Sequence, residues 1–451
     1  MKFNPLPIFI TAVAIYLLIK LRFFFILHPI STARRGLRAV KDKRARRSFS
    51  LALAGTLGVG NVFGVAIGIM LGGAGSLFWL AISMLFAMAI KYSEVVLSAD
   101  NLFHDADSHG GIAYVLRATS RRFGRHLSRG YSLCVLFLSV IMGAALQTDA
   151  IVKCAASGMS ISPLAIAVFL VASVLCAIIG GIKKIEKITA FVIPLTTIIY
   201  IIITISVIVA NASNMGRVIS EILSSAFSLR SAVGGIGGFL LLAPIREGFA
   251  RGILSNEAGA GTSAMAHSRS GLLSPSSAGI LGIFEVWFDT GVVCMLTGFS
   301  ILLAVPDTAL FSDGMALVNY AVGNLFGSFG KYLLTLTVFA FAFATVICWY
   351  YYGSEAWGML FGKRKRVIFL PLFLLFVFYG CFADTALLIT LTDLLMLIAT
   401  LLTLFALIKS SDRIKELSEL GGVLDSENGR LRRLRVKNIK GILSWKGEKH
   451  R

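Results

Sequence analysis

Two glycine clusters interrupt hydrophobic segments of this chain where a membrane-spanning helix would have to be continuous. They are Gly55-Thr56-Leu57-Gly58-Val59-Gly60-Asn61 and Gly234-Gly235-Ile236-Gly237-Gly238. Glycine has no Cβ and adopts backbone conformations closed to other residues, so such clusters unwind helices and expose bare N–H and C=O groups. Inside a bilayer these groups are tolerated only where they line a protein-walled cavity. A pair of interrupted helices in corresponding halves of a chain is typical of the central site of a secondary transporter.

The composition predicts a polytopic membrane protein, because 57% of the 451 residues are hydrophobic and only 15% are charged. At roughly 20 residues per span the length allows about eleven spans and leaves no room for a large soluble domain. The first hydrophobic stretch lacks a small-residue cleavage site, so we expect a retained helix and not a signal peptide. The expected spans are residues 6–27, 48–73, 75–99, 130–157, 161–181, 187–210, 231–252, 276–304, 329–361, 366–382 and 384–409.

The net charge of +20 comes from basic residues that gather in alternate loops. Lys and Arg are enriched in cytoplasmic loops, so the pattern predicts one face of a cell membrane and not a nucleic-acid surface. It predicts an odd number of spans, with the N-terminus outside and the C-terminus in the cytoplasm; Arg217 and Arg230 are a mild exception. The residues expected on the cytoplasmic side are Arg34, Arg35, Arg38, Lys41, Lys43, Arg44, Arg46, Arg47, Arg117, Arg121, Arg122, Arg125, Arg129, Lys183, Lys184, Lys187, Arg246, Arg251, Arg269 and Lys363 to Arg366.

The expected fold is all-α, with a 5+5 inverted repeat. Without the first helix, ten spans form two sets of five, and each set begins with a glycine-broken helix. Five is an odd number, so the second set enters the membrane from the opposite side, as an inverted repeat requires. The predicted divisions are a peripheral helix and basic loop (1–47), a first repeat (48–210), a second repeat (211–409) and a basic cytoplasmic tail (410–451).

Several segments match a known family in order and spacing. They are Leu53–Ala66, Leu71–Trp79, Lys91–Leu97, Gly252–Gly261 with Ala266-His267, Phe288–Thr290 and Cys348–Gly353. Together they resemble the sodium:alanine symporter family, also called the alanine or glycine:cation symporters. The resemblance covers nearly everything from residue 5 to about 408.

The resemblance implies a leucine-transporter-like core and sodium-coupled symport of small neutral amino acids, alanine or glycine, into the cell. A broken helix suits a zwitterion, because its half-helix N-terminus offers N–H groups to a carboxylate and its unwound carbonyls accept from an ammonium group. The implied substrate-binding residues are Gly58, Val59, Gly60, Asn61, Gln147, Gly237, Gly238 and Trp349, and the implied sodium ligands are Ala54, Leu57 and Thr345.

Three of these residues have simpler interpretations that remain open. A glutamine inside a bundle often bonds a neighbouring helix, which is the alternative for Gln147. Trp349 could be an interfacial anchor. The Thr345 hydroxyl could bond a carbonyl of its own helix.

A cytoplasmic gate is the hypothesis for the segment around Glu257. We expect Ser255, Asn256 and Glu257 to lie on the cytoplasmic side, with Glu257 paired to Arg246 or Arg251 in one transport state. The alternative is a static cluster that caps the loop, because surface ion pairs contribute only about 0–1 kcal/mol.

The chain departs from the family pattern near the expected site. Phe63 narrows the space that it faces, and Ala344 removes a hydroxyl next to Thr345. Asp149 either pairs with Lys153 one turn along the helix or reaches the cavity and binds a cation. Glu285 and Asp289 should face protein or water, because a charge at the bilayer centre is costly.

Other function classes are weaker. The six histidines lie in loops, near helix ends or in the tail, and no nucleophile motif accompanies them, so we expect no enzyme. A non-transporting sensor or a proton-coupled transporter on the same fold remains an alternative. The tail mixes basic and apolar residues over 430–446, which predicts either a helix that binds anionic lipid or a disordered segment.

Overall fold

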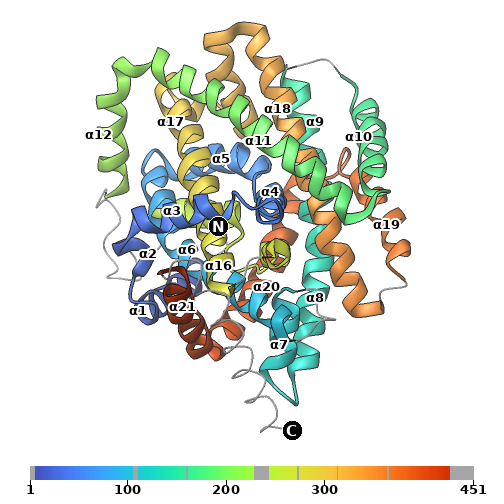
Figure 1. Cartoon of the computed structure of the whole chain (residues 1–451). Coiled ribbons are helices and arrows are strands. Elements are labelled where there is room, and N and C mark those ends of the chain that lie inside the picture. Colours follow the sequence, from blue (N-terminus) through green and yellow to red (C-terminus); the bar gives the residue numbers. More distant parts are fainter. Residues whose placement is uncertain are drawn as a thin grey trace.

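The computed structural model describes residues 6–104, 110–158, 161–227, 243–271, 274–311, 313–362 and 365–426. Every regular element in these ranges is a helix, as Figure 1 shows. The elements are α1 Leu6–Lys20, α2 Phe24–Leu27, α3 Pro29–Ala39, α4 Lys43–Thr56, η1 Val59–Asn61, α5 Phe63–Gly72, α6 Gly75–His104, α7 Ile112–Thr119, α8 Gly124–Val140, η2 Ile141–Ala145, α9 Leu146–Gly158, α10 Pro163–Ile178, α11 Gly181–Ala210, η3 Ala212–Asn214, α12 Met215–Ala226, α14 Ala243–Asn256, α15 Ser263–His267, η4 Ser268–Ser270, α16 Pro275–Val286, η5 Trp287–Cys294, α17 Met295–Ala304, η6 Thr308–Leu310, α18 Gly314–Phe361, α19 Arg366–Tyr379, α20 Thr385–Lys409 and α21 Ser411–Ser426.

The chain is an all-helical membrane protein. In the described ranges, six helical segments are long and apolar enough to cross a bilayer, and a bent pair makes a seventh. The six are Gly75–Asp100, Gly124–Ala155, Gly181–Ala210, Pro275–Ala304, Gly314–Phe361 and Thr385–Lys409. Shorter apolar helices lie at Pro7–Lys20, Pro163–Ile178 and Arg366–Tyr379, where three further spans were predicted.

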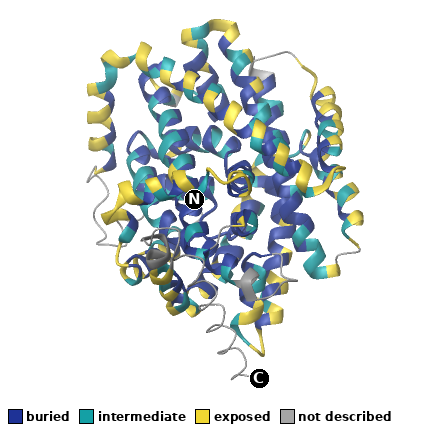
Figure 2. Cartoon of the chain, viewed as in Figure 1, coloured by how far each residue is buried: buried dark blue, intermediate teal, exposed yellow. Residues whose placement is uncertain are grey.

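The helices bury their inner faces and expose apolar side chains outward, as Figure 2 shows for the centre and rim of the molecule. On α11, Phe191, Ile198 and Ile202 are 70%, 57% and 59% exposed, while Tyr200 is fully buried. Exposed apolar side chains along a membrane helix suit contact with lipid chains. Among the buried polar side chains are Asn61, Ser255 and Asp289, which lie in the interior near two helix breaks.

The first break is the one that the sequence predicts. Helix α4 ends at Thr56, a short turn of 3-10 helix follows, and α5 begins at Phe63. The two halves are bent by 61°. At Gly58 the backbone is extended (φ −120°, ψ −155°), so the regular helical hydrogen bonds stop here. The prediction of a broken helix at Gly55–Asn61 is confirmed.

A second break lies between α14 and α15, at Glu257–Thr262. Glu257, Gly259 and Gly261 have φ of 53°, 94° and 72°, which no α-helix accommodates. Ser255 and Asn256 end α14 and Glu257 begins the break, and all three are at most 4% exposed, so they do not form an exposed loop. Their cytoplasmic side stays a prediction. The predicted break at Gly234–Gly238, including Gly237 and Gly238, lies outside the described residues.

Helix α14 packs along α5 and α6. A Cβ at Gly72 would lie 3.0 Å from the Ala243 carbonyl oxygen, and one at Gly68 would lie 3.2 Å from Cγ of Arg251. Helix α14 therefore starts beside the end of α5 and runs back toward the first break. Arg251 therefore lies in a helix, beside α5, and not in a loop. The cytoplasmic side expected for it stays a prediction.

Other differences concern segments expected to be loops. The basic loop after the first span is α3 and the start of α4, where the Asp42 carboxylate accepts from the N–H groups of Arg44 (2.8 Å) and Ala45 (3.0 Å). The first span turns at Arg22 and Phe23, where φ is 54° and 52°. Part of the predicted tail is α21, which packs on α6 and α16; residues 427–451 lie outside the described ranges.

Candidate functional site

Asn61 joins the two helix breaks. Its amide nitrogen donates to the Ser255 hydroxyl at 3.0 Å and to a carboxylate oxygen of Asp289 at 2.7 Å. Its amide oxygen accepts from the N–H of Gly58 at 3.2 Å. Asn61 is 1% exposed, so all of these bonds are shielded from bulk water. The end of the first break is thereby tied to the end of α14 and to η5.

Asp289 is the acceptor at the centre of this network. Besides Asn61, the hydroxyls of Ser255 (2.8 Å) and Thr290 (3.0 Å) donate to it. The side-chain amide of Asn256 donates to Thr290 at 3.1 Å and extends the network. A buried carboxylate is costly unless it is hydrogen-bonded, and the three donors to Asp289 meet that requirement. Asp289 and Glu285 are both fully buried, which confirms that they face protein.

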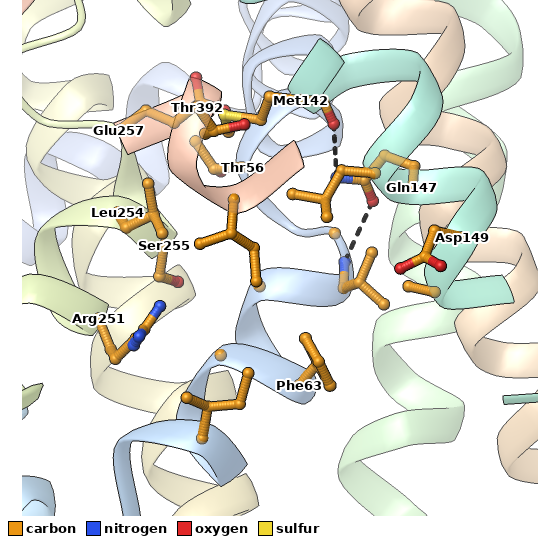
Figure 3. Close-up of a pocket in the computed structure, with 18 of the residues that line it drawn as sticks. Thr56, Phe63, Met142, Gln147, Asp149, Arg251, Leu254, Ser255, Glu257 and Thr392 are labelled. Atoms are coloured by element: carbon orange, nitrogen blue, oxygen red, sulfur yellow. Dashed lines mark hydrogen bonds between the residues drawn. The ribbon is translucent and has the colours of Figure 1, made fainter. Parts of the chain in front are cut away.

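A cavity lies beside this network, and both breaks line it (Figure 3). The lining residues are Gly55, Thr56, Gly58, Val59, Gly60, Phe63, Gly64, Ile67, Met142, Leu146, Gln147, Asp149, Ala150, Lys153, Arg251, Leu254, Ser255, Glu257, Met315, Ile389, Thr392 and Asp393. The structure therefore brings together Gly58, Val59, Gly60 and Gln147, as the sequence analysis expects.

Gln147 bonds directly to the first break. Its side-chain oxygen accepts from the N–H of Val59 at 3.4 Å, and its nitrogen donates to the Met142 carbonyl at 3.3 Å (Figure 3). A Cβ at Gly58 would lie 3.0 Å from the Gln147 oxygen and 2.9 Å from the Thr345 hydroxyl. Glycine is needed at position 58 because α9 and α18 approach its backbone so closely.

Trp349 and the expected sodium ligands lie behind the cavity wall. Trp349 is fully buried, and its indole N–H donates to the Gly55 carbonyl at 3.3 Å, so it is not an interfacial anchor. The Thr345 hydroxyl lies 3.4 Å from the Leu57 carbonyl oxygen and 3.0 Å from the Phe341 carbonyl oxygen. Thr345 thus bonds its own helix and also the end of α4. Ala54 is fully buried in the last turn of α4.

The expected ion pair of Glu257 with Arg246 or Arg251 is absent from this structure. The two arginines bond the Glu247 carboxylate, at 3.0 Å and 3.4 Å. Glu247 lies one turn before Arg251 on α14, so these two residues pair within one helix and their pairing does not depend on the conformation of the second break. Glu257 instead accepts from the Thr262 hydroxyl at 2.6 Å. A gate built on the expected pair would require another conformation.

Asp149 is paired as the simpler of its two interpretations predicts. Its carboxylate lies 3.2 Å from Nζ of Lys153, and the Thr385 hydroxyl donates to it at 2.8 Å. Both charged residues line the cavity, so the pair forms part of its wall. Thr385 is the first residue of α20, and the contact ties α9 to α20.

Sequence reasoning missed Ser255, Glu257 and Asp289 as neighbours of the first break. The signal was available in part, because Ser255-Asn256-Glu257 belongs to the most specific motif of the chain. The partners of Asn61 are 194 and 228 residues away, and no periodic pattern connects positions so distant.

Comparisons with known proteins agree with this architecture. A model of the sodium:alanine symporter family matches residues 2–419. The sodium/alanine symporter AgcS of Methanococcus maripaludis is 29% identical over 353 residues, 76% of either chain. The probable sodium/glutamine symporter GlnT of Bacillus subtilis is 28% identical over 90% of this chain and 85% of its own. A crystal structure of the Eremococcus coleocola manganese transporter superposes with a TM-score of 0.50 at 14% identity, over 89% of this chain and 92% of that one, which is a likeness of fold.

Proposed function

Since the chain belongs to the sodium:alanine symporter family, we propose that it carries small neutral amino acids, alanine or glycine, into the cell by symport with sodium. Family membership makes it a cation-coupled amino acid symporter and not an enzyme. The size of the substrate and the identity of the ion are the proposed parts. The observation that carries the proposal is the pair of helix breaks, joined through Asn61 beside one cavity.

The proposed substrate site lies between the first break, Gln147 and the second break. The N–H groups near the start of α5 and the positive end of its helix dipole suit an α-carboxylate. Gln147 already bonds the first break through Val59, so it is placed to share its amide with a bound carboxylate. We assign the matching acceptors for the ammonium group to the break that follows Ser255; Gly237 and Gly238 remain a sequence prediction.

The proposed sodium site uses the carbonyls of Ala54 and Leu57 and the hydroxyl of Thr345. Hard cations prefer oxygen ligands, and an unwound helix end supplies carbonyls that no N–H group occupies. The 3.4 Å contact between the Thr345 hydroxyl and the Leu57 carbonyl, which come from α18 and α4, supports this assignment. Ala344 supplies no hydroxyl, so positions 344 and 345 together offer one hydroxyl ligand, where threonine at both positions would offer two.

The proposed architecture is eleven spans in the leucine-transporter-like 5+5 arrangement. Two observations support it. The helix pair α4–α5 that begins the first proposed repeat is broken, and the second break follows α14 in the second proposed repeat. The fold also resembles that of a known transporter. We propose a cell-membrane location with the N-terminus outside and the C-terminus in the cytoplasm, on the basis of the basic loops.

Sodium-dependent thermal stabilisation of the purified protein tests the ligand assignment. Alanine or glycine should raise Tm in sodium buffer and not in choline buffer, because a ligand that binds only the folded state stabilises it. Leucine and phenylalanine should leave Tm unchanged, since Phe63 narrows the cavity. A larger shift with leucine than with alanine would refute the size assignment. The same measurement with glutamine distinguishes the proposed preference for alanine or glycine from the glutamine specificity named for the Bacillus subtilis relative.

The basic tail carries a separate proposal. We propose that residues 428–451 bind anionic lipid, because each Lys or Arg near an anionic surface contributes about 1 kcal/mol and Trp445 suits the interface. The isolated peptide should bind vesicles containing anionic lipid more tightly than neutral ones. Equal affinity for both would refute the proposal.

A further inference from the structure

Glu257 is an unusual buried carboxylate at the start of the second break. It is fully buried, and its φ of 53° is in the region that favours glycine. One carboxylate oxygen accepts from the Thr262 hydroxyl at 2.6 Å. The other, Oε1, has no hydrogen-bond partner among the described residues. A strained backbone and an unpartnered carboxylate oxygen fall on the same residue of the cavity wall.

Two threonines line the cavity at the same end as Glu257, away from Phe63 (Figure 3). Thr392 of α20 is 2% exposed, and its hydroxyl has no partner in the described part of the chain. Thr390, two residues earlier, bonds the Ala386 carbonyl of its own helix at 2.7 Å. A helical threonine normally has that option. The hydroxyls of Thr400 and Thr403 on α20 also have no partner in the described structure, and Thr392 is the one of the three that lines the cavity. The Thr56 hydroxyl makes only a 3.5 Å contact to the Leu53 carbonyl.

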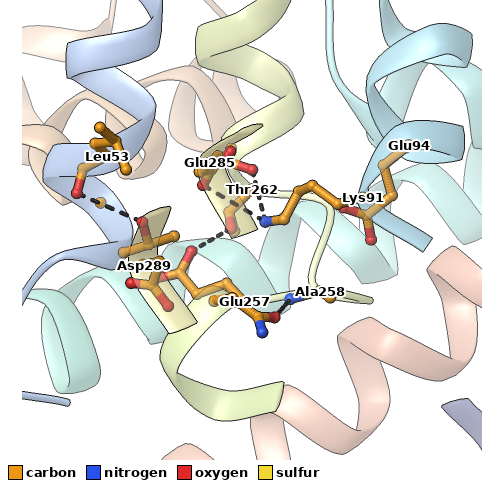
Figure 4. Close-up of polar contacts among 12 residues, drawn as sticks. Leu53, Lys91, Glu94, Glu257, Ala258, Thr262, Glu285 and Asp289 are labelled. Atoms are coloured by element: carbon orange, nitrogen blue, oxygen red, sulfur yellow. Dashed lines mark hydrogen bonds and ion pairs between the residues drawn. The ribbon is translucent and has the colours of Figure 1, made fainter. Parts of the chain in front are cut away.

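The positive charge nearby is already engaged elsewhere (Figure 4). Nζ of Lys91 donates to the Ser263 hydroxyl at 2.8 Å and lies 3.7 Å from the Glu285 carboxylate. His267 also bonds Glu285, at 2.6 Å. Glu94 is fully buried as well and accepts from the Gly259 N–H at 2.7 Å.

The charges of this cluster do not balance in the described structure. Lys91 lies near three fully buried carboxylates, those of Glu94, Glu257 and Glu285, and in the described structure it forms an ion pair with Glu285 alone. Each of the three has one carboxylate oxygen without a hydrogen-bond partner there. A buried carboxylate that has neither a counter-charge nor a full set of hydrogen-bond donors is strongly destabilising, so such a group either is neutralised or binds a cation. Glu257 is the carboxylate that also lines the cavity, where an ion can reach it.

We propose that Glu257, Thr392 and Thr56 bind a Na⁺ ion at this end of the cavity. The position is separate from the sodium site proposed beside Leu57 and Thr345, because those two residues do not line the cavity. The ligands come from the second break, α20 and the end of α4, so a bound ion joins the two breaks to α20. The inference rests on the proposed function and adds a second coupling ion to it.

The test is the sodium dependence of alanine uptake into proteoliposomes. The wild type should respond sigmoidally, with a Hill coefficient between one and two, because two ions bind per turnover and the number of sites is the upper limit. Glu257→Gln removes the charge without changing shape, and Thr392→Val removes the hydroxyl. Both should give a hyperbolic response with half-saturation raised about tenfold, the equivalent of about 1.4 kcal/mol. Thr390→Val, on the exposed face of α20, is the matched control and should behave as wild type.

The outcomes separate the two proposals. No sodium-driven uptake by the wild type would contradict the proposed function itself. Sodium-driven uptake with wild-type sodium curves for Glu257→Gln and Thr392→Val would overturn only the second site. A Glu257→Gln protein that loses its pH dependence while keeping its sodium curve would show that Glu257 carries a proton, which also overturns the assignment. If Glu257→Gln does not fold, Thr392→Val decides alone.

Discussion

Asn61 ties three segments together through one side chain. Its oxygen holds the Gly58 N–H, and its nitrogen reaches Ser255 and Asp289. The sequence predicted its place, directly after Gly-x-Gly, but not its partners. Local spacing tells which residues follow a helix break, whereas long-range contacts depend on how whole helices pack.

Replacing Asn61 with alanine should abolish sodium-driven uptake. The change leaves Asp289 with one donor fewer and frees the Gly58 N–H, and each unsatisfied buried group costs about 1–3 kcal/mol. We expect a lower Tm and uptake at the level of empty liposomes. Asn211→Ala, at the end of α11 and outside the network, is the control. Normal uptake by Asn61→Ala would contradict the role assigned to this network.

Phe63 lines the cavity where α5 begins, and its removal should widen the range of substrates. Phe63→Ala should admit amino acids with larger apolar side chains, such as valine or leucine, while weakening alanine binding through lost contacts. Competition of each amino acid against labelled alanine measures the effect. If the variant keeps the wild-type size preference, another part of the cavity sets the limit.

The Asp149–Lys153 pair predicts an effect on stability. Asp149→Asn removes the charge partner of Lys153, which keeps only its hydrogen bond to the Thr385 hydroxyl. The free energy of unfolding should therefore fall by about 1 kcal/mol, as for partly exposed pairs. Adding Lys153→Met should restore Tm, and the sodium dependence should stay unchanged throughout. A changed sodium requirement in folded Asp149→Asn would instead revive the hypothesis that this carboxylate binds a cation.

Among the helices, one break was predictable and the other was not. Three glycines within Gly55–Gly60 mark the first break directly. At the second, the residue that starts the non-helical backbone is Glu257, and glutamate is a good helix former, so propensity points the wrong way. The two glycines that follow, Gly259 and Gly261, are equally typical of a loop between two helices, so they did not predict a break. Side-chain bonds hold the break instead. Two are local, from the Ala258 N–H to the Asn256 side chain and from the Thr262 hydroxyl to Glu257, and one is tertiary, from the Gly259 N–H to Glu94 of α6.

Close packing of α14 on α6 depends on small residues. A Cβ at Gly248 would overlap the Ser76 carbonyl oxygen, which is backbone and cannot move aside without shifting the helix. Gly248→Ala should therefore destabilise the protein by about 1–3 kcal/mol through overpacking. Gly130→Ala in α8, where a Cβ meets nothing within 4 Å, should be neutral or raise stability by up to about 1 kcal/mol. Equal Tm values for the two variants would contradict the packing described.

For the whole molecule, hydropathy predicted the helical class and the approximate positions of the spans, because burial in lipid demands long apolar helices. The surface helices α3, α12 and α21 were not predicted. Each of these helices lies between apolar segments or after the last one, and its charged residues are typical of a loop. Packing against neighbouring helices is what makes these segments helical. The same packing brings both breaks to one cavity in the buried interior.

Sodium-driven uptake into proteoliposomes tests the central claim most directly. Purified protein is reconstituted, and labelled alanine is followed with an inward sodium gradient, with an inward proton gradient and with neither. Accumulation above equilibrium should occur with the sodium gradient and collapse when an ionophore dissipates it. Accumulation driven by protons alone, or binding of alanine without accumulation under any gradient, would contradict sodium-coupled symport.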